Sequence, residues 1–116
     1  ARLMMIKDEP YVAYLLTRGG AVALVRRPPK GLLGGMLGLP TSDWRDRPWA
    51  DHEAVSAAPV ETNWRDAGEI DHVFTHFSLT LRVFRAEGDM AAEWTAPGGL
   101  GALPSVFLKA ARLGLG

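Results

Sequence analysis

A short polar motif precedes a strongly apolar segment in the second half of the chain. Residues 72–84 are HVFTHFSLTLRVF, and Phe74, Thr75 and His76 supply an aromatic ring, a hydroxyl and an imidazole at consecutive positions. In a tight loop these groups suit contact with a nucleobase, because the hydroxyl and the backbone N–H can bond to a base edge while the phenyl ring stacks or wedges. The structural alternative places Phe74 in the core and Thr75 as a strand cap.

The histidines of this segment also have a spacing that is used in metal sites. His72 and His76 are four residues apart, as in helices that bind zinc through one face. Residues 77–83 alternate between apolar and polar, however, which predicts a strand and would separate the two imidazoles by about 13 Å. The sequence has no cysteine, and His52 is its third histidine. We therefore expect no metal site.

Other motifs for catalysis or phosphate binding are missing from the sequence. It contains no Gly-x-Ser-x-Gly, and GLLGG at 31–35 is not followed by the Gly-Lys-[Ser/Thr] of a P-loop. We expect the apolar segment 28–40, PPKGLLGGMLGLP, to be a packed loop that closes one side of the core. Arg26, Arg27 and Lys30 are candidate contacts for DNA phosphates, although a solvated basic face would have the same composition.

The composition indicates one globular domain. Of 116 residues 47% are hydrophobic, and 13 basic and 13 acidic residues give zero net charge. Neutrality argues against strong unaided binding to nucleic acid, because phosphate neutralisation supplies much of the affinity of such proteins. The absence of cysteine fits a cytoplasmic location. No segment approaches the roughly 20 apolar residues that a membrane span needs, so no membrane partner is expected.

The pattern along the chain predicts an α+β or mixed α/β domain. Strands are expected at 11–18, 21–27, 77–85 and 90–95. Helices are expected at 47–58 and 104–114, each of which begins near a proline. Gly19 and Gly20 separate the first two strands and predict a hairpin turn.

Three segments together resemble the C-terminal domain of MutY-type adenine DNA glycosylases. Members of this family carry an R-R-P-x-x-G-L-L-G-G-L-W-E-F-P-like loop, then H-x-F-[S/T]-H-x-x-L-x-L, then a helix that opens with Leu-Pro. The corresponding segments here are 22–40, 72–84 and 103–114, in the same order. Leu37 and Gly38 stand where the family has Trp and Glu.

The resemblance implies a Nudix-like fold, in which a mixed, curved sheet lies between helices, and a role in DNA repair. Whole MutY enzymes remove adenine that is mispaired with 8-oxoguanine, so the implied partners are duplex DNA with this mispair and the catalytic domain of the parent chain. The family's catalytic acids and iron–sulfur cysteines belong to an N-terminal helical domain. We therefore expect residues 1–116 to be a recognition domain from a longer protein, without cofactor or catalysis of its own, in the nucleoid-associated cytoplasm of a bacterium.

The resemblance also assigns a role to the polar motif, because the family's Phe-Ser-His loop contacts 8-oxoguanine and corresponds to Phe74, Thr75 and His76. In 8-oxoguanine, N7 carries a hydrogen and C8 a carbonyl oxygen. A hydroxyl that accepts from N7–H, beside a backbone N–H directed at O8, would favour the lesion over guanine. An unpaired buried donor costs about 1–3 kcal/mol, so two such contacts give roughly hundredfold discrimination.

Two other functions remain open. A Nudix hydrolase of oxidised nucleotides holds Mg²⁺ with a helix bearing R-E-x-x-E-E. The corresponding region here has Asp43, Asp46, Asp51 and Glu53 without that spacing. The second alternative is a protein-interaction module, in which an exposed apolar patch on the loop 31–40 docks on the catalytic domain.

Overall fold

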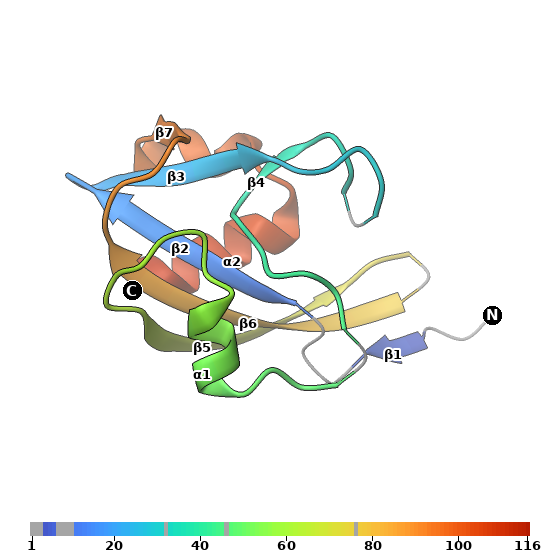
Figure 1. Ribbon diagram of the computed structural model, residues 1–116. Coiled ribbons are helices and arrows are strands. Elements are labelled where there is room, and N and C mark those ends of the chain that lie inside the picture. Colours follow the sequence, from blue (N-terminus) through green and yellow to red (C-terminus); the bar gives the residue numbers. More distant parts are fainter. Residues whose placement is uncertain (1–3, 7–10, 32, 46, 76) are drawn as a thin grey trace.

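The computed structural model describes residues 4–6, 11–31, 33–45, 47–75 and 77–116. The strands are β1 (Met4–Ile6), β2 (Val12–Arg18), β3 (Ala21–Arg26), β4 (Leu37–Gly38), β5 (Arg65–Val73), β6 (Phe77–Glu87) and β7 (Glu93–Thr95). The helices are α1 (Asp51–Ser56), the 3-10 helix η1 (Pro97–Ala102) and α2 (Ser105–Leu115). In this described part of the chain, α1 and α2 lie on opposite faces of a central sheet (Figure 1).

The sheet contains both parallel and antiparallel pairs. The strand order is β1–β6–β2–β3–β4, with β5 beside β6 and β7 beside β3. β6 runs parallel to β1 and β2 but antiparallel to β5. β3 is antiparallel to its neighbours β2, β4 and β7. The predicted architecture, a mixed sheet between helices, is confirmed.

The central strand β2 is buried on both faces, which explains its continuous apolar sequence. Ala13 and Leu15 pack in the core layer under α2, whereas Tyr14 and Leu16 pack in the layer under α1. The Tyr14 hydroxyl donates to the Ala54 carbonyl oxygen at 2.5 Å, which ties α1 to the sheet. Burial raises the pKa of Tyr14 to about 12. The core is therefore split into two layers by the sheet.

The β2–β3 hairpin lies where the sequence predicts it. Arg18 pairs with Ala21 across the turn, and Gly19 and Gly20 have φ angles of 56° and 84°. A two-residue type I′ turn requires both residues in the left-handed region, which glycine adopts without steric cost. The local sequence alone is enough to specify this element.

β5 occupies a segment for which the sequence predicts no complete strand. Its register with β6 shifts between Asp66 and Gly68, where Gly68 has a φ of 111°. Because of this bulge, Ala67 and Ile70 both pack against the core layer under α2 although they are three residues apart. The bulge removes the two-residue period by which a strand is recognised in a sequence.

α1 begins later than predicted, at Asp51 rather than near Pro48. Ala50 is the N-cap, and the Glu53 carboxylate accepts a hydrogen bond from the Ala50 N–H at 3.1 Å. This half of a capping box fixes the first turn of the helix, because it satisfies an N–H that has no partner within the helix. Pro48 therefore lies in the preceding loop.

α2 agrees with the helix predicted at 104–114, and its buried face consists of Val106, Phe107, Ala110, Ala111 and Gly114. Two glycines let it lie close to the sheet. A Cβ at Gly38 would be 2.7 Å from the Phe107 ring, and one at Gly114 would be 2.4 Å from Leu15 Cδ2. Phe107 thus fills the space beside Gly38. None of the helices in the described ranges is long and apolar enough to cross a membrane.

Two segments differ from expectation mainly in length. β7 covers three residues of the strand predicted at 90–95. The loop predicted at 28–40 is a packed loop as expected, except that its last part forms the two-residue strand β4 against β3. Very short strands depend on their partner rather than on their own sequence, so a sequence pattern does not reveal them.

Candidate nucleic-acid interface

The polar motif forms the turn between β5 and β6. Val73 and Ser78 are the last paired residues of the hairpin, and the Phe74 N–H donates to the Phe77 carbonyl oxygen at 2.7 Å. This hydrogen bond closes a tight turn around Thr75. His76, the third predicted contact, lies outside the described residues.

Phe74 packs within the protein rather than extending from it. Its ring stacks on Phe77 with centroids 4.6 Å apart and planes at 19°, and the edge of His72 meets it at 4.8 Å and 75°. The ring is half-buried and contacts the core layer under α2. The Phe74 ring therefore packs in the protein and supports the turn, and it does not extend outward as a wedge between bases would.

Thr75 lies at the tip of the turn with its side chain exposed. Among the described residues its hydroxyl has no hydrogen-bond partner, so a donor and two acceptor sites remain available to a ligand. Val73 beside it is 62% exposed. An apolar side chain this exposed at the end of a strand, next to the turn, suits contact with a flat apolar surface such as a base or sugar. Its exposure could not be inferred from the strand pattern.

His72 supports the turn through the contact of its ring with Phe74. Its Nδ1 is buried and has no hydrogen-bond partner among the residues that the structure describes. Burial, together with the nearby Lys109 ammonium, lowers the pKa of His72, so the imidazole is neutral at pH 7. Lys109 itself donates to the Asp71 carbonyl oxygen at 3.1 Å, which joins α2 to β5 just before the turn.

The three basic candidates do not lie in equivalent positions. Arg26 and Lys30 are exposed and line a cavity of about 360 Å³, whose wall also includes Trp44, itself 49% exposed. Arg26 donates to the Gly35 carbonyl oxygen at 2.6 Å, which leaves the other N–H groups of its guanidinium for a ligand. Trp44 was not a candidate in the sequence, because its exposure depends on how the loop folds.

Arg27, in contrast, is only 8% exposed. Its guanidinium lies over the rings of Tyr11 and Phe107, at 5.7 and 5.4 Å, and donates to Thr41 Oγ1 at 2.9 Å. Burial lowers the pKa of Arg27, whereas the nearby Tyr11 acts to raise it. This placement favours a packing role for Arg27 and leaves Arg26 and Lys30 as the residues that face outward.

The loop between β3 and β4 is folded tightly on itself. The Gly35 N–H lies 3.1 Å from the Pro28 carbonyl oxygen, and a Cβ on Gly34 would be 2.4 Å from the Pro29 carbonyl oxygen. In Figure 1 this loop and the β5–β6 turn extend from the same end of the molecule. The loop that contains Lys30 and the turn that contains Thr75 therefore lie toward one end of the domain.

The apolar residues of the same loop are less exposed than an interaction patch requires. Leu33 and Leu37 are half-buried against the core, Leu39 is fully buried, and Met36 is 45% exposed. Leu32, which also belongs to the expected patch, lies outside the described residues. Of the described members, Met36 alone is exposed, which weakens the alternative of a docking loop.

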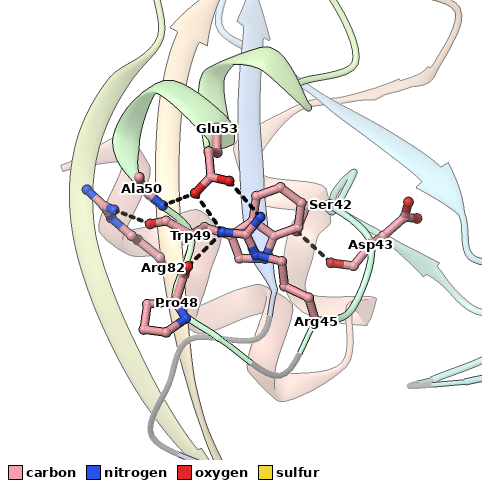
Figure 2. A network of polar contacts seen from close by, with 8 residues as sticks. All are labelled: Ser42, Asp43, Arg45, Pro48, Trp49, Ala50, Glu53 and Arg82. Carbon is pink, nitrogen blue, oxygen red and sulfur yellow. Dashed lines mark hydrogen bonds and ion pairs between the residues drawn. The ribbon is translucent and has the colours of Figure 1, made fainter.

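The acidic residues around α1 bind arginines of the protein itself. Figure 2 shows Arg45 paired with Glu53 through two hydrogen bonds of 2.7 and 3.0 Å. Arg45 also donates to the Pro48 carbonyl oxygen at 2.7 Å, and its guanidinium stacks over the Trp49 ring at 3.9 Å. The hydrogen bond from Arg45, followed by the one from the Ala50 N–H, lowers the pKa of Glu53 to about 2.

Arg82 of β6 neutralises the neighbouring carboxylates. It is hydrogen-bonded to Asp51 and, at 2.7 Å, to Asp66. Burial acts to raise the pKa of Asp66, but the bonds from Arg82 and from the Gly68 N–H hold it below its usual value. Within the described ranges no group of three or more His, Cys, Asp or Glu side chains is placed to hold a metal ion.

Comparison with known proteins agrees with the fold. The NUDIX domain family matches residues 11–111. The chain belongs to this family. Two solved structures share its fold: the C-terminal domain of mouse MUTYH in complex with human PCNA, and the MutT NUDIX hydrolase from Burkholderia pseudomallei. The first has a TM-score of 0.65 at 19% identity, covering 89% of this chain and 84% of that one. The second has a TM-score of 0.66 at 16% identity, covering 97% and 98%.

Sequence similarity favours one branch of this family. The chain is 34% identical to the adenine DNA glycosylase of Rattus norvegicus over 91 residues, which are 71% of the chain and 18% of the relative. It is 32% identical to the human enzyme over 89 residues, or 69% and 16%. The chain thus spans less than a fifth of the length of these relatives. The resemblance to the C-terminal domain of adenine DNA glycosylases, inferred from three motifs, is confirmed.

Proposed function

We propose that this domain recognises 8-oxoguanine opposite adenine in duplex DNA, as the recognition domain of an adenine DNA glycosylase. The observation that carries the proposal is the exposed Thr75 hydroxyl, without a partner among the described residues, on a turn held rigid by stacked rings. The similarity of the chain to adenine DNA glycosylases supports a role of this turn in DNA repair. Excision of adenine belongs, in this proposal, to a catalytic domain of the parent protein.

The chemistry of discrimination is local. Thr75 accepts a hydrogen bond from N7–H of 8-oxoguanine, a donor that guanine lacks, and a backbone N–H of the turn donates to O8. Guanine has a hydrogen at C8 in place of O8, so the backbone N–H of the turn would be left without an acceptor, and its N7 accepts, so the Thr75 hydroxyl would have to donate instead. Because the stacked Phe74 and Phe77 rings fix the turn before binding, little conformational entropy is lost when the base arrives.

Phosphate contacts come from the neighbouring loop in this proposal. Arg26 and Lys30 are exposed, and the loop that follows Arg26 extends from the same end of the molecule as the β5–β6 turn (Figure 1). Contacts of this kind position the protein on the duplex and do not depend on the base. Arg27 supports them indirectly, since it anchors the start of the loop between two aromatic rings.

The hydrolase alternative is less well supported by the geometry. A pyrophosphohydrolase needs carboxylates that are free to hold Mg²⁺ on the phosphates. Here Asp51 and Glu53 are bound to Arg82 and Arg45, and the similarity to a MutT hydrolase is one of fold. Release of pyrophosphate from 8-oxo-dGTP with Mg²⁺ would contradict the recognition role as the sole function.

The deciding experiment is a titration of the ¹⁵N-labelled chain with two duplexes that differ only in 8-oxoguanine or guanine opposite adenine. We expect chemical shift changes at Phe74 and Thr75 with the lesion duplex that exceed those with the control. Thr75→Val, which keeps the branched shape but removes the hydroxyl, should reduce the preference for the lesion about tenfold or more. Thr75→Ser should retain the preference.

The control variant is Thr95→Ala on β7, outside the turn, which should leave the preference unchanged. Equal binding of both duplexes by the unmodified chain would show that this domain does not recognise the lesion by itself. An unchanged preference in Thr75→Val would remove Thr75 from it.

A further inference from the structure

A second cavity lies at the end of the sheet opposite the β5–β6 turn. Its volume is about 550 Å³. It is lined by Leu15, Thr17, Asn63, Arg65, Arg85, Ala86, Glu87, Gly114 and Leu115, so it opens where the C-terminal end of α2 crosses β2 and β6 (Figure 1). β5 runs nine residues from Arg65 to Val73, which separates the cavity from the Thr75 turn by roughly 26 Å at ~3.3 Å per residue.

Two arginines of this cavity oppose each other directly. Arg65 of β5 is the register partner of Arg85 of β6. Side chains of directly opposed residues project to the same face, with Cβ atoms about 5 Å apart, and like charges in that position destabilise the pair of strands. The sheet therefore holds two guanidinium groups together without an evident structural benefit.

Neither arginine is neutralised by the protein. In the part of the chain that the structure describes, Arg65 forms no hydrogen bond or ion pair. Arg85 makes one hydrogen bond, a long one of 3.5 Å to the Gly114 carbonyl oxygen at the end of α2. Glu87 lies two residues along β6 and also lines the cavity, but it forms no ion pair with either arginine. A guanidinium has five N–H donors, so most of those in the cavity have no acceptor.

We propose that this cavity binds a phosphate group between Arg65 and Arg85. The planar guanidinium groups offer pairs of parallel N–H donors that match two oxygens of an oxyanion. A phosphate bound there would turn the repulsion between the arginines into two attractive contacts. The Asn63 amide supplies an uncharged donor at the wall of the cavity. This site does not depend on the function proposed for the Thr75 turn.

Two sources could supply the phosphate: a free nucleotide, for which the cavity has sufficient volume, or the backbone of DNA that continues beyond the lesion. Both offer the same oxyanion chemistry. Glu87 opposes either ligand by charge repulsion. Its removal should therefore strengthen binding, whereas removal of Arg65 should weaken it.

The test is a titration of the ¹⁵N-labelled chain with inorganic phosphate at constant ionic strength, with chloride as the reference anion. We expect shift changes at Asn63, Arg65 and Gly114 and at the Arg65 and Arg85 Nε–H groups. Arg65→Gln should weaken phosphate binding about tenfold, because it removes a charged donor. Glu87→Gln should strengthen it severalfold, and Arg47→Gln, an exposed arginine outside the cavity, should have no effect.

Equal shifts with chloride and phosphate would overturn the proposal, as would unaltered phosphate affinity in Arg65→Gln. Arg65 is exposed, so its replacement is expected to leave the fold intact, and the unchanged spectrum outside the cavity would verify this. Two further ligands identify the source: dGMP should bind more tightly than inorganic phosphate if the ligand is a nucleotide. An undamaged duplex should shift the same resonances, with dGMP no better than phosphate, if it is DNA.

Discussion

At the scale of single residues, the conformation of the Thr75 turn depends on side chains that would not themselves contact the base in the function that we propose. His72, Phe74 and Phe77 form a column of rings under the turn, and Lys109 and Asp71 tie its base to α2. A hydrogen-bonding group that is fixed before binding discriminates better than a mobile one, since the wrong base cannot be accommodated by rearrangement. The support residues should therefore affect recognition through the conformation of the turn.

His72 makes this support sensitive to pH. Its pKa in the folded protein is lowered from 6.5, first by burial and then by Lys109, so the unfolded chain binds more protons in this range. Stability should consequently be lost as the pH falls from above 6.5 through the folded-state value. His72→Phe, which keeps a ring against Phe74, should reduce this loss when urea unfolding is measured at pH 7.5 and 5.5. The exposed His52→Gln is the matched control, and a variant His72→Phe with the full loss would contradict the role of His72.

At the scale of elements, α1 is held by Arg45 together with the Tyr14 hydroxyl and Arg82. Arg45 joins the loop before α1 to Glu53 within the helix, and Glu53 in turn caps the Ala50 N–H. A helix of six residues is too short to be stable by itself, so its position depends on such contacts and on the buried Ala54. The carboxylates of Asp51 and Glu53 thus stabilise the position of α1 through their arginine partners.

Glu53→Gln tests this contribution in acid. The folded-state pKa of Glu53 is about 2, against a usual value of 4.5, so its stabilising effect is complete above pH 4.5 and is lost as the pH falls through about 2. The difference in the free energy of unfolding between the wild type and Glu53→Gln should be largest at neutral pH and shrink steadily below pH 4.5. Glu61→Gln, an exposed glutamate in the following loop, is the control. A difference that is independent of pH would show that the charge of Glu53 is not what fixes α1.

The elements also show which parts of the structure follow from local sequence. The β2–β3 hairpin, β6 and α2 were predictable, because a glycine pair, an alternating pattern and a proline at the helix start each favour one conformation. β5 was not, since the bulge at Gly68 breaks its period. Arg27 was placed among the outward-facing candidates because its burial depends on Tyr11 and Phe107, which come from distant parts of the chain. Thr75 is a candidate because of its motif, whereas the exposure of Trp44 depends on the fold.

At the scale of the whole molecule, zero net charge is combined with an uneven distribution of charge. The acids near α1 are paired with Arg45 and Arg82, while Arg26 and Lys30 are exposed at the start of the β3–β4 loop. For the DNA binding that we propose, long-range attraction would therefore be weak, and the affinity would come from a few local contacts.

The salt dependence of DNA binding can count these contacts. Each phosphate neutralised contributes about −0.9 to the slope of log K against log salt concentration on duplex DNA. If Arg26 and Lys30 each contact one phosphate, the double variant Arg26→Gln, Lys30→Gln should reduce the slope by about two and weaken binding equally for lesion and control duplexes. Fluorescence anisotropy at several salt concentrations would measure it, with the exposed Arg112→Gln on α2 as the control. An unchanged slope would mean that the phosphates are bound elsewhere, whereas a selective loss for the lesion duplex would place these side chains at the base instead of the backbone.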